Sequence, residues 1–333
     1  MRIALVSDAW APQVNGVVRT LEMVVAEVLA AGHAVQTVTP DRFRTIPCPT
    51  YPEIRLSLKP RRRVEAMIEQ FGADAIHIAT EGPLGIAARA MCLARGLTFT
   101  TAFHTRFPEY VAARFGVPAR WTYAWLRRFH APSQGVMVAS ESIRRELVER
   151  GFGRLRPWSR GVDEMLFHPR RRREDFGFER PIFLFVGRLA VEKNLPAFLD
   201  LDLPGSKLVV GDGPLVEQLR RRYPACHFLG ERDGEALARI YASADVFVFP
   251  SQTDTFGLVL LEALASGLPV AAFPVSGPLD VIGDSGAGVL DIDLGRAAVA
   301  ALDLSREACR DHALRYSWPG SARQFLANLA PFR

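Results

Sequence analysis

The chain has 333 residues, about twice the usual length of one domain, so two domains are expected. Hydrophobic residues make up 49% and charged residues 23%, which excludes an intrinsically disordered chain. The four cysteines lie far apart without a Cys-x-x-Cys pair, which excludes a disulfide framework and a cysteine zinc site. The longest apolar stretch, residues 257–273, contains Glu262 and Pro269 and does not suit a membrane span. We expect a cytoplasmic protein without a signal peptide, and only peripheral membrane contact.

The net charge is +5 and the pI about 9.3, which is compatible with nucleic acid, an anionic membrane or a phosphorylated substrate as partner. Three arginine-rich runs carry much of this charge, at residues 59–63, 170–173 and 220–222. The run KPRRR, from Lys59 to Arg63, is either a membrane contact or a solvated face. A second group of candidates for membrane contact is aromatic. These side chains form either an interfacial patch or part of the core: Trp121, Tyr123, Trp125 and Phe129.

Short apolar runs alternate with helical patterns along the first half, which predicts parallel strands joined by helices. The first strand is predicted at residues 3–6 and the first helix at 17–31. The other predicted strands of this half are residues 34–39, 75–78, 98–103 and 135–138.

A second series of the same kind follows residue 173, with strands predicted at residues 182–186, 207–210, 227–229, 246–249 and 270–273. Residues 155–173 are rich in Arg, Pro and Gly and are interpreted as a linker. The sequence therefore predicts an α/β protein with two doubly wound domains, residues 1–165 and 166–315. A final amphipathic helix within residues 316–333 is expected to pack back on the first domain.

Residues 249–263 (FPSQTDTFGLVLLEA) pass from an apolar strand through a polar loop into a helix. Asp254 therefore stands at the carboxyl end of a strand beside a helix N-terminus, where doubly wound sheets bind ligands. Asp254 and the backbone N–H groups of Phe256, Gly257 and Leu258 suit sugar hydroxyls. Glu262, about 8 Å along the helix, suits ribose hydroxyls. The alternative is that Asp254 caps the helix and Glu262 faces solvent.

Residues 185–195 (FVGRLAVEKNL) also follow an apolar strand. Arg188 can bond two phosphate oxygens and Lys193 can add a point charge, so together they suit a diphosphate; separately, each is as easily explained as solvated surface. Gly211 in the turn GDGP is interpreted mainly as a residue that permits a tight turn, and secondly as part of a wall of the nucleotide site. The loop after the first strand lacks the Gly-x-Gly-x-x-Gly pattern of dinucleotide binding.

Three residues of the first half are weaker candidates. Gly16 follows Asn15 at a helix start, where backbone N–H groups can meet a phosphate, although Asn-Gly is also an ordinary turn. His104 follows a strand and either touches substrate or is structural. Arg160 either faces the phosphates or pairs with a carboxylate at the domain edge.

Six segments in order, PQVNGVVRT, FHTRFPEY, SRGVD, VGRLAVEKNL, VGDGP and TDTFGLVLLEA, resemble glycosyltransferase family 4. The resemblance implies the GT-B fold, with two Rossmann-like domains facing a central cleft, and transfer of a hexose with retention of configuration and without metal or cofactor. It implies that Arg188 and Lys193 bind the donor diphosphate and Glu262 the ribose. It places Gly16 at the phosphate and His104 near the reacting face of the donor sugar.

Asp254 stands where many members of the family have Glu. The NGVVRT, HTRFPEY, TDTFG and SGPLDVI segments are most similar to GDP-mannose-dependent α-mannosyltransferases and to sulfoquinovosyl- or glucuronosyl-diacylglycerol synthases. The resemblance thus implies a UDP- or GDP-sugar donor and a membrane-lipid acceptor such as diacylglycerol, at the inner face of the cytoplasmic membrane. Two alternatives are a soluble or polysaccharide acceptor for the same chemistry and, more remotely, a basic nucleic-acid-binding protein.

Overall fold

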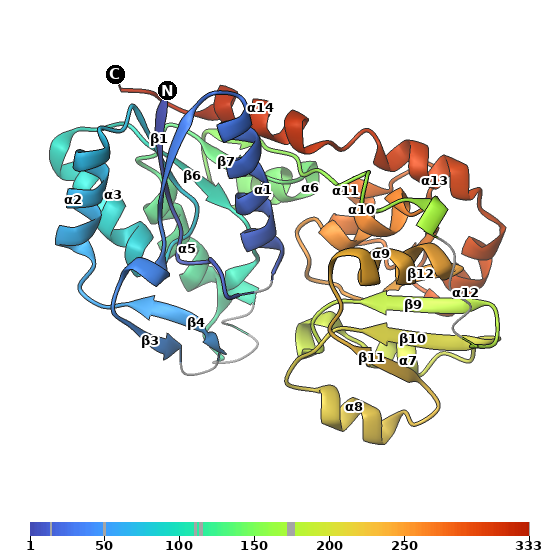
Figure 1. The fold of residues 1–333 in the computed structure, drawn as a ribbon. Coiled ribbons are helices and arrows are strands. Elements are labelled where there is room, and N and C mark those ends of the chain that lie inside the picture. The colour runs from blue at the N-terminus through green and yellow to red at the C-terminus, as the bar shows by residue number, and fades with distance from the viewer. Residues whose placement is uncertain (14, 49–50, 110–111, 113–115, 172–176, 333) are drawn as a thin grey trace. The chain divides into compact units, whose positions relative to one another are not determined.

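The computed structural model describes the chain except for residues 14, 49–50, 110–111, 113–115, 172–176 and 333. Part of the basic run at residues 170–173 therefore lies outside the described residues. The described chain forms two compact units, which are treated separately (Figure 1). Unit 1 comprises Met1–Arg160 and Trp318–Arg333, and unit 2 comprises Gly161–Ser317. Both are α/β with parallel six-stranded sheets, which confirms the predicted fold class.

The sheet of unit 1 has the strand order β2-β1-β5-β6-β7-β8. Its strands are β1 (Arg2–Val6), β2 (Ala34–Val38), β5 (Ala75–Ile78), β6 (Thr100–Phe103), β7 (Val136–Val138) and β8 (Leu155–Pro157). A separate antiparallel pair consists of β3 (Thr45–Cys48) and β4 (Tyr51–Ser57). The chain leaves β1 toward β2 on one side and returns to β5 on the other. The carboxyl ends of β1 and β5 therefore flank the point where the strand order reverses, the usual ligand position in such sheets.

Helices cover both faces of this sheet (Figure 1). They are α1 (Gly16–Ala30), η1 (Pro40–Arg42), α2 (Arg61–Phe71), α3 (Pro83–Arg95), α5 (Ala119–His130), α6 (Glu141–Glu149) and α14 (Trp318–Asn328). Apolar side chains of α2 and α3, among them Val64, Ile68 and Met91, share one core with Ala4 and Ile76 of the sheet. The chain's last helix, α14, belongs to this unit, where Ser321 Oγ donates to the Ser159 carbonyl oxygen at 2.8 Å.

The sheet of unit 2 has the order β11-β10-β9-β12-β13-β14, the same doubly wound arrangement. Its strands are β9 (Ile182–Val186), β10 (Ser206–Val210), β11 (His227–Gly230), β12 (Val246–Phe249), β13 (Val270–Ala272) and β14 (Gly288–Leu290). Every residue of β9 and β12 is buried, because helices cover both faces. The strand order reverses between β9 and β12, which are paired in parallel.

The helices of unit 2 are η2 (Pro169–Arg171), η3 (Val191–Lys193), α7 (Pro196–Leu199), α8 (Val216–Arg222), α9 (Gly234–Ser243), α10 (Leu258–Ala265), α11 (Ser276–Val281), α12 (Leu294–Ala300), η4 (Ala301–Asp303) and α13 (Arg306–Ala313). Phe198 of α7, Leu219 of α8 and Ala297 of α12 pack with Phe183 and Val248 on one face of the sheet. This packing positions β9 and β12, and with them the starts of the loops that leave their carboxyl ends.

Candidate functional site

The loops that follow β9 and β12 bring together the predicted residues of unit 2. Because the two strands are parallel neighbours, their carboxyl ends open at the same edge of the sheet. The loops are also tied to each other. Ser251 Oγ donates to the Glu192 carbonyl oxygen at 3.3 Å, and Asn194 Nδ2 donates to that of Pro250 at 3.2 Å. Asn194 adopts a left-handed conformation (φ +52°), which asparagine tolerates better than most residues.

An ion pair joins these loops. Lys193 Nζ donates to Asp254 Oδ1 at 2.6 Å, and the two side chains are 23% and 17% exposed. The second carboxylate oxygen of Asp254, Oδ2, is buried and has no hydrogen-bond partner among the described residues. A buried acceptor without a donor lowers the stability of the folded protein. Asp254 Oδ2 can therefore accept a hydrogen bond from a hydroxyl or N–H group of a ligand.

Glycines hold the Arg188 loop against the turn GDGP. A Cβ on Gly211 would lie 2.0 Å from the Gly187 carbonyl oxygen, and Gly211 has φ +134°. Leu189 N donates to the Asp212 carbonyl oxygen at 2.9 Å, across the same contact. Only a residue without a side chain permits this approach, so Gly211 shapes the loop that carries the half-buried Arg188.

Helix α10 begins at Leu258, with Gly257 as its N-cap in a left-handed conformation (φ +88°). Phe256 is buried, and Gly277 at the start of α11 packs against this loop: a Cβ there would lie 2.9 Å from the Phe256 carbonyl oxygen. Glu262 is half-buried one turn into α10, where Tyr241 Oη donates to its Oε2 at 3.1 Å. Sequence reasoning missed Tyr241, because this buried tyrosine comes from α9 and follows no site motif.

Asp254 does not cap α10 through its side chain; its Oδ1 accepts from Lys193 instead. Glu262 likewise bonds Tyr241 within the protein. Unit 2 thus brings Arg188, Lys193 and Asp254 to the loops at one sheet edge, with Glu262 on the helix that follows, as an arrangement of two cations and two carboxylates.

In unit 1, Asn15 is the N-cap of α1: its Oδ1 accepts from Val17 N and Val18 N, both at 3.0 Å. This cap satisfies two of the N–H groups that begin the helix, while Gly16 remains exposed at its first position. The N–H groups of Val17 and Val18 are thus occupied by the cap. The predicted phosphate contact at this helix start then rests on the N–H group of Gly16.

His104 and Arg160 lie together in unit 1, 9% and 5% exposed. Arg160 Nη2 is 3.2 Å from His104 Nδ1, and Arg160 Nη1 donates to the carbonyl oxygens of Trp158 and Ser159. Burial, with the nearby charges of Arg160 and His77, lowers the pKa of His104 well below its usual value. Burial also lowers the pKa of Arg160, to about 9. The guanidinium thus binds groups of its own unit.

Asp8, at the carboxyl end of β1, was not singled out from the sequence. Its carboxylate accepts from Leu84 N at 2.9 Å, from Gly85 N at 3.2 Å and from Thr80 Oγ1 at 3.0 Å, and so caps α3. Burial raises its pKa to about 6 despite these hydrogen bonds. An acid two residues after the first apolar strand is the sequence signal that points to this position.

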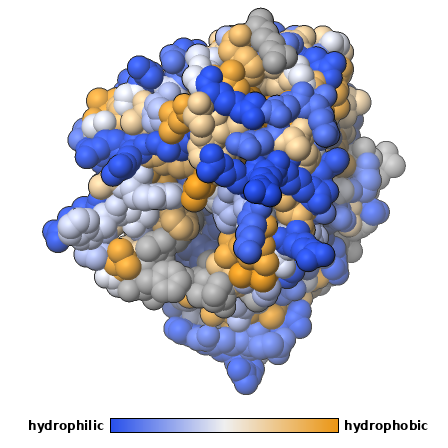
Figure 2. Space-filling model, turned by 90° about the vertical axis from the view of Figure 1, so that its left-hand side faces the viewer, coloured by the Kyte–Doolittle hydropathy of each residue, from blue (hydrophilic) through white to orange (hydrophobic). Residues whose placement is uncertain are grey.

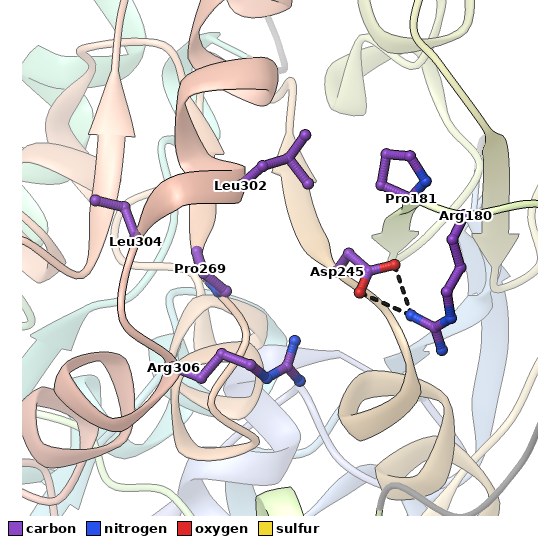
Figure 3. Close-up of a pocket in the computed structure, with 7 residues that line it drawn as sticks. All are labelled: Arg180, Pro181, Asp245, Pro269, Leu302, Leu304 and Arg306. Atoms are coloured by element: carbon purple, nitrogen blue, oxygen red, sulfur yellow. Dashed lines mark hydrogen bonds and ion pairs between the residues drawn. The ribbon is translucent and has the colours of Figure 1, made fainter.

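A pocket of about 340 Å³ in unit 2 lies at the opposite edge of the sheet (Figure 3). Its lining residues Arg180 and Pro181 precede β9, and Asp245 precedes β12. Arg180 Nη1 bonds both carboxylate oxygens of Asp245 at 2.7 Å, and Arg306 donates to backbone carbonyl oxygens. Since doubly wound sheets bind ligands at the carboxyl ends of their strands, this pocket is separate from the candidate site.

The remaining candidates lie on the surface. Lys59 and the arginines that begin α2 are exposed. Of the aromatic stripe, Tyr123 and Phe129 are buried in the core, whereas Trp121 and Trp125 of α5 are 63% and 43% exposed. No helix in the described part of the chain has the length and apolar character needed to cross a bilayer.

Comparison with known proteins bears on both units. The family Glycosyltransferase Family 4 matches residues 14–165, and Glycosyl transferases group 1 matches residues 180–305. The chain is 31% identical to a GDP-mannose-dependent alpha-mannosyltransferase of Mycobacterium tuberculosis, over all of this chain and 97% of that protein. It is 26% identical to an alpha-monoglucosyldiacylglycerol synthase of Streptococcus pneumoniae, over 91% and 78% of the two chains.

Among solved structures, sucrose-phosphate synthase from Thermosynechococcus elongatus has the same fold, with a TM-score of 0.79 at 23% identity over 98% of this chain and 97% of that one. The predicted GT-B fold is thereby confirmed. Matches to both halves, and a relative 31% identical along the entire length, show that this chain belongs to glycosyltransferase family 4.

Proposed function

We propose that this glycosyltransferase moves a hexose from a UDP- or GDP-sugar to a membrane lipid such as diacylglycerol, with retention of configuration and without a metal ion. The observation that carries the donor half of this proposal is the Lys193–Asp254 pair, which stands beside the Arg188 loop where the strand order of unit 2 reverses. Two cations at such an edge suit a diphosphate.

The donor contacts follow from what each group can do. Arg188 and Lys193 bind the diphosphate, and the backbone N–H groups at Phe256, Gly257 and Leu258 add to the positive end of α10. Asp254 accepts from sugar hydroxyls through its buried Oδ2, and Glu262, oriented by Tyr241, accepts from the ribose. Gly211 lets the GDGP turn form one wall of the site in unit 2. In unit 1, Gly16 is proposed to contact a phosphate oxygen and His104 a sugar.

The chemistry needs no protein nucleophile. The bond between the anomeric carbon and the phosphate oxygen breaks through an oxocarbenium-like transition state, and the acceptor oxygen attacks from the same face. The leaving phosphate oxygen takes the proton of the acceptor hydroxyl. Negative charge grows on that phosphate, so Arg188 and Lys193 bind the transition state more tightly than the ground state.

Metal independence is supported by the same two cations, which supply the charge that a metal would otherwise provide. The sequence contains two Asp-x-Asp segments, residues 200–202 and 291–293, which is the pattern of metal-dependent sugar-nucleotide enzymes. The first acid of each has a partner elsewhere: Asp200 accepts from Tyr223 Oη at 2.7 Å, and Asp291 accepts from Arg296 Nε at 2.7 Å. Transfer by wild-type enzyme should therefore persist at full rate in excess chelator. A rate that collapses in chelator and recovers with added divalent cation would refute this part of the proposal.

The lipid acceptor is supported by the diacylglycerol named in one relative and by the surface of unit 1. Arg61, Arg62 and Arg63 occupy the first turn of α2, which has no acidic residue there and no side-chain cap. Positive charges at a helix N-terminus oppose the helix dipole, and anionic headgroups relieve this repulsion. Leu58, next to the run, is 48% exposed. The face shown in Figure 2 carries hydrophobic spots between hydrophilic side chains rather than one continuous apolar area.

Vesicle flotation tests the membrane surface. We expect wild-type protein to float with phosphatidylglycerol vesicles, and the triple variant Arg61→Gln, Arg62→Gln, Arg63→Gln to bind about 10²-fold more weakly, at about 1 kcal/mol per charge. The matched control replaces the exposed arginines at residues 220–222, in the last turn of α8, by Gln. Equal loss in both triples, or no flotation of wild type, would favour a soluble or polysaccharide acceptor.

Donor identity is tested by thermal shift with UDP-, GDP- and ADP-sugars, followed by transfer assays with diacylglycerol. Arg188→Ala should remove most of the shift while leaving the unfolding temperature of the free protein nearly unchanged. Binding of RNA in preference to every nucleotide sugar would instead indicate the remote alternative, a nucleic-acid-binding protein.

A further inference from the structure

A buried polar cluster in unit 1 joins three segments that are distant in the sequence. His104 follows β6, Trp158 follows β8 and is fully buried, and Arg160 comes two residues later. The Arg160 guanidinium lies 4.7 Å from the centre of the Trp158 ring, and the His104 ring meets the same indole edge-on at 5.5 Å. Trp158 thus holds both polar side chains in place.

The hydrogen bond between Arg160 and His104 fixes which ring nitrogen carries the proton. A guanidinium has only N–H donors and no acceptor, so His104 Nδ1, 3.2 Å from Arg160 Nη2, must be the unprotonated acceptor. The proton of the neutral ring is then on Nε2. The depressed pKa of His104 agrees, because burial and the Arg160 charge both disfavour a second proton.

Arg160 is itself anchored independently of any ligand. Its Nη1 donates to the Trp158 carbonyl oxygen at 2.7 Å and to that of Ser159 at 3.2 Å. No carboxylate pairs with it within the described residues, so nothing on that side draws the guanidinium away from His104. A carboxylate in its place, the usual partner of a catalytic histidine, would accept from Nδ1–H and produce the opposite tautomer.

We propose that Arg160 is a positioning residue that holds His104 as the neutral Nε2–H tautomer, so that His104 serves as a hydrogen-bond donor to a sugar hydroxyl oxygen and not as a general base. This inference rests on the proposed transfer reaction for its functional half. It gives Arg160 a role through His104 rather than through the donor phosphates.

The tautomer can be measured without any activity. In full-length protein labelled with ¹⁵N-histidine, His104 should show a pyridine-type signal for Nδ1 and a pyrrole-type signal for Nε2 at pH 7. Assignment uses the signals lost in His104→Gln. A pyrrole-type Nδ1, or a doubly protonated ring, in wild-type protein would overturn the inference even if transfer is fully active.

Variants of Arg160 test the functional half. Arg160→Lys retains a group that can only donate and should retain the tautomer and most of kcat. Arg160→Gln offers an amide oxygen that can accept from Nδ1–H; we expect it to populate the other tautomer and lower kcat about tenfold with little change in the donor KM. Arg156→Gln is the matched control, because Arg156 bonds the backbone of Gln134 and Asn328 and not His104.

His104→Leu should lower kcat by about 10²-fold, and His104→Gln, which keeps an N–H near the Nε2 position, by much less. An Arg160→Gln protein that populates the Nδ1–H tautomer but turns over at the wild-type rate would refute the inference. If no sugar transfer is found with any donor, the proposed function fails, while the nitrogen signals still decide the tautomer.

Discussion

From the ion pair between Lys193 and Asp254 we predict how substitutions of the two residues, alone and combined, change the affinity for a nucleoside diphosphate. Lys193→Met removes a cation from the proposed diphosphate site and leaves the Asp254 carboxylate without its partner. Asp254 then repels the diphosphate that Lys193 previously attracted. Adding Asp254→Asn to Lys193→Met removes this repulsion, so we expect the double variant to bind a nucleoside diphosphate better than Lys193→Met alone.

The size of the effect follows from Coulomb's law. Two unit charges about 4 Å apart interact by about 4 kcal/mol at an effective dielectric constant of 20 and about 1 kcal/mol in bulk water. Side chains that are 23% and 17% exposed lie between these limits, at about 2 kcal/mol. Lys193→Met loses this attraction while the repulsion from Asp254 stays, so binding should weaken by about 30-fold; Asp254→Asn removes a repulsion of similar size, so the double variant should regain about 30-fold.

Isothermal titration with GDP and UDP measures this cycle in wild type, both single variants and the double variant. Asp254→Asn alone should bind the diphosphate more tightly than wild type, because Lys193 is no longer neutralised. Lys207→Met is the matched control, since Lys207 Nζ donates to the carbonyl oxygens of Leu199 and Leu201, away from the site. Its affinity should stay within about threefold of wild type.

Two results would refute this prediction: no gain in affinity from Asp254→Asn in either background, which would mean that Asp254 does not act on the bound phosphate, or equal weakening by Lys193→Met and Lys207→Met, which would mean that Lys193 does not. Thermal unfolding of each variant separates loss of affinity from loss of fold.

Three further predictions concern the supports of the site. Tyr241→Phe removes the donor to Glu262 and should lower stability by about 1 kcal/mol and weaken nucleoside diphosphate binding several-fold; unchanged affinity in calorimetry would show that Glu262 needs no orientation. Gly211→Ala places a methyl group 2.0 Å from the Gly187 carbonyl oxygen and should lower the free energy of unfolding by about 3 kcal/mol. Gly153→Ala, where no atom lies within 4 Å of the new Cβ, should change it by less than about 0.5 kcal/mol. Urea titration of both variants measures this difference. Because burial raises the folded-state pKa of Asp8 from 3.8 to about 6, protonation favours the folded state, and wild type should lose up to about 3 kcal/mol of stability relative to Asp8→Asn as pH rises from 4 to 6. Parallel stability–pH curves for the two proteins would contradict this.

Much of the fold follows from local pattern. Continuous apolar runs predicted β9 and β12 at the bounds that the structure has, because strands buried on both faces need no polar alternation. Strands β8 and β14, three residues each, were not predicted: β8 lies in a segment interpreted as linker, and both are too short to show a period. The hairpin β3-β4 was missed as well.

The sequence by itself placed Arg188, Lys193, Asp254 and Glu262 after strands of one sheet, since polar residues that follow a buried strand stand at its carboxyl edge. Their roles toward a donor stay predictions. The pairing of Lys193 with Asp254, the hydrogen bond from Tyr241 to Glu262, and the Arg160 guanidinium on His104 were decided by tertiary structure alone. Each joins segments at least twenty residues apart, and hydrogen bonds at that separation depend on strand order and packing, which local periodicity does not encode.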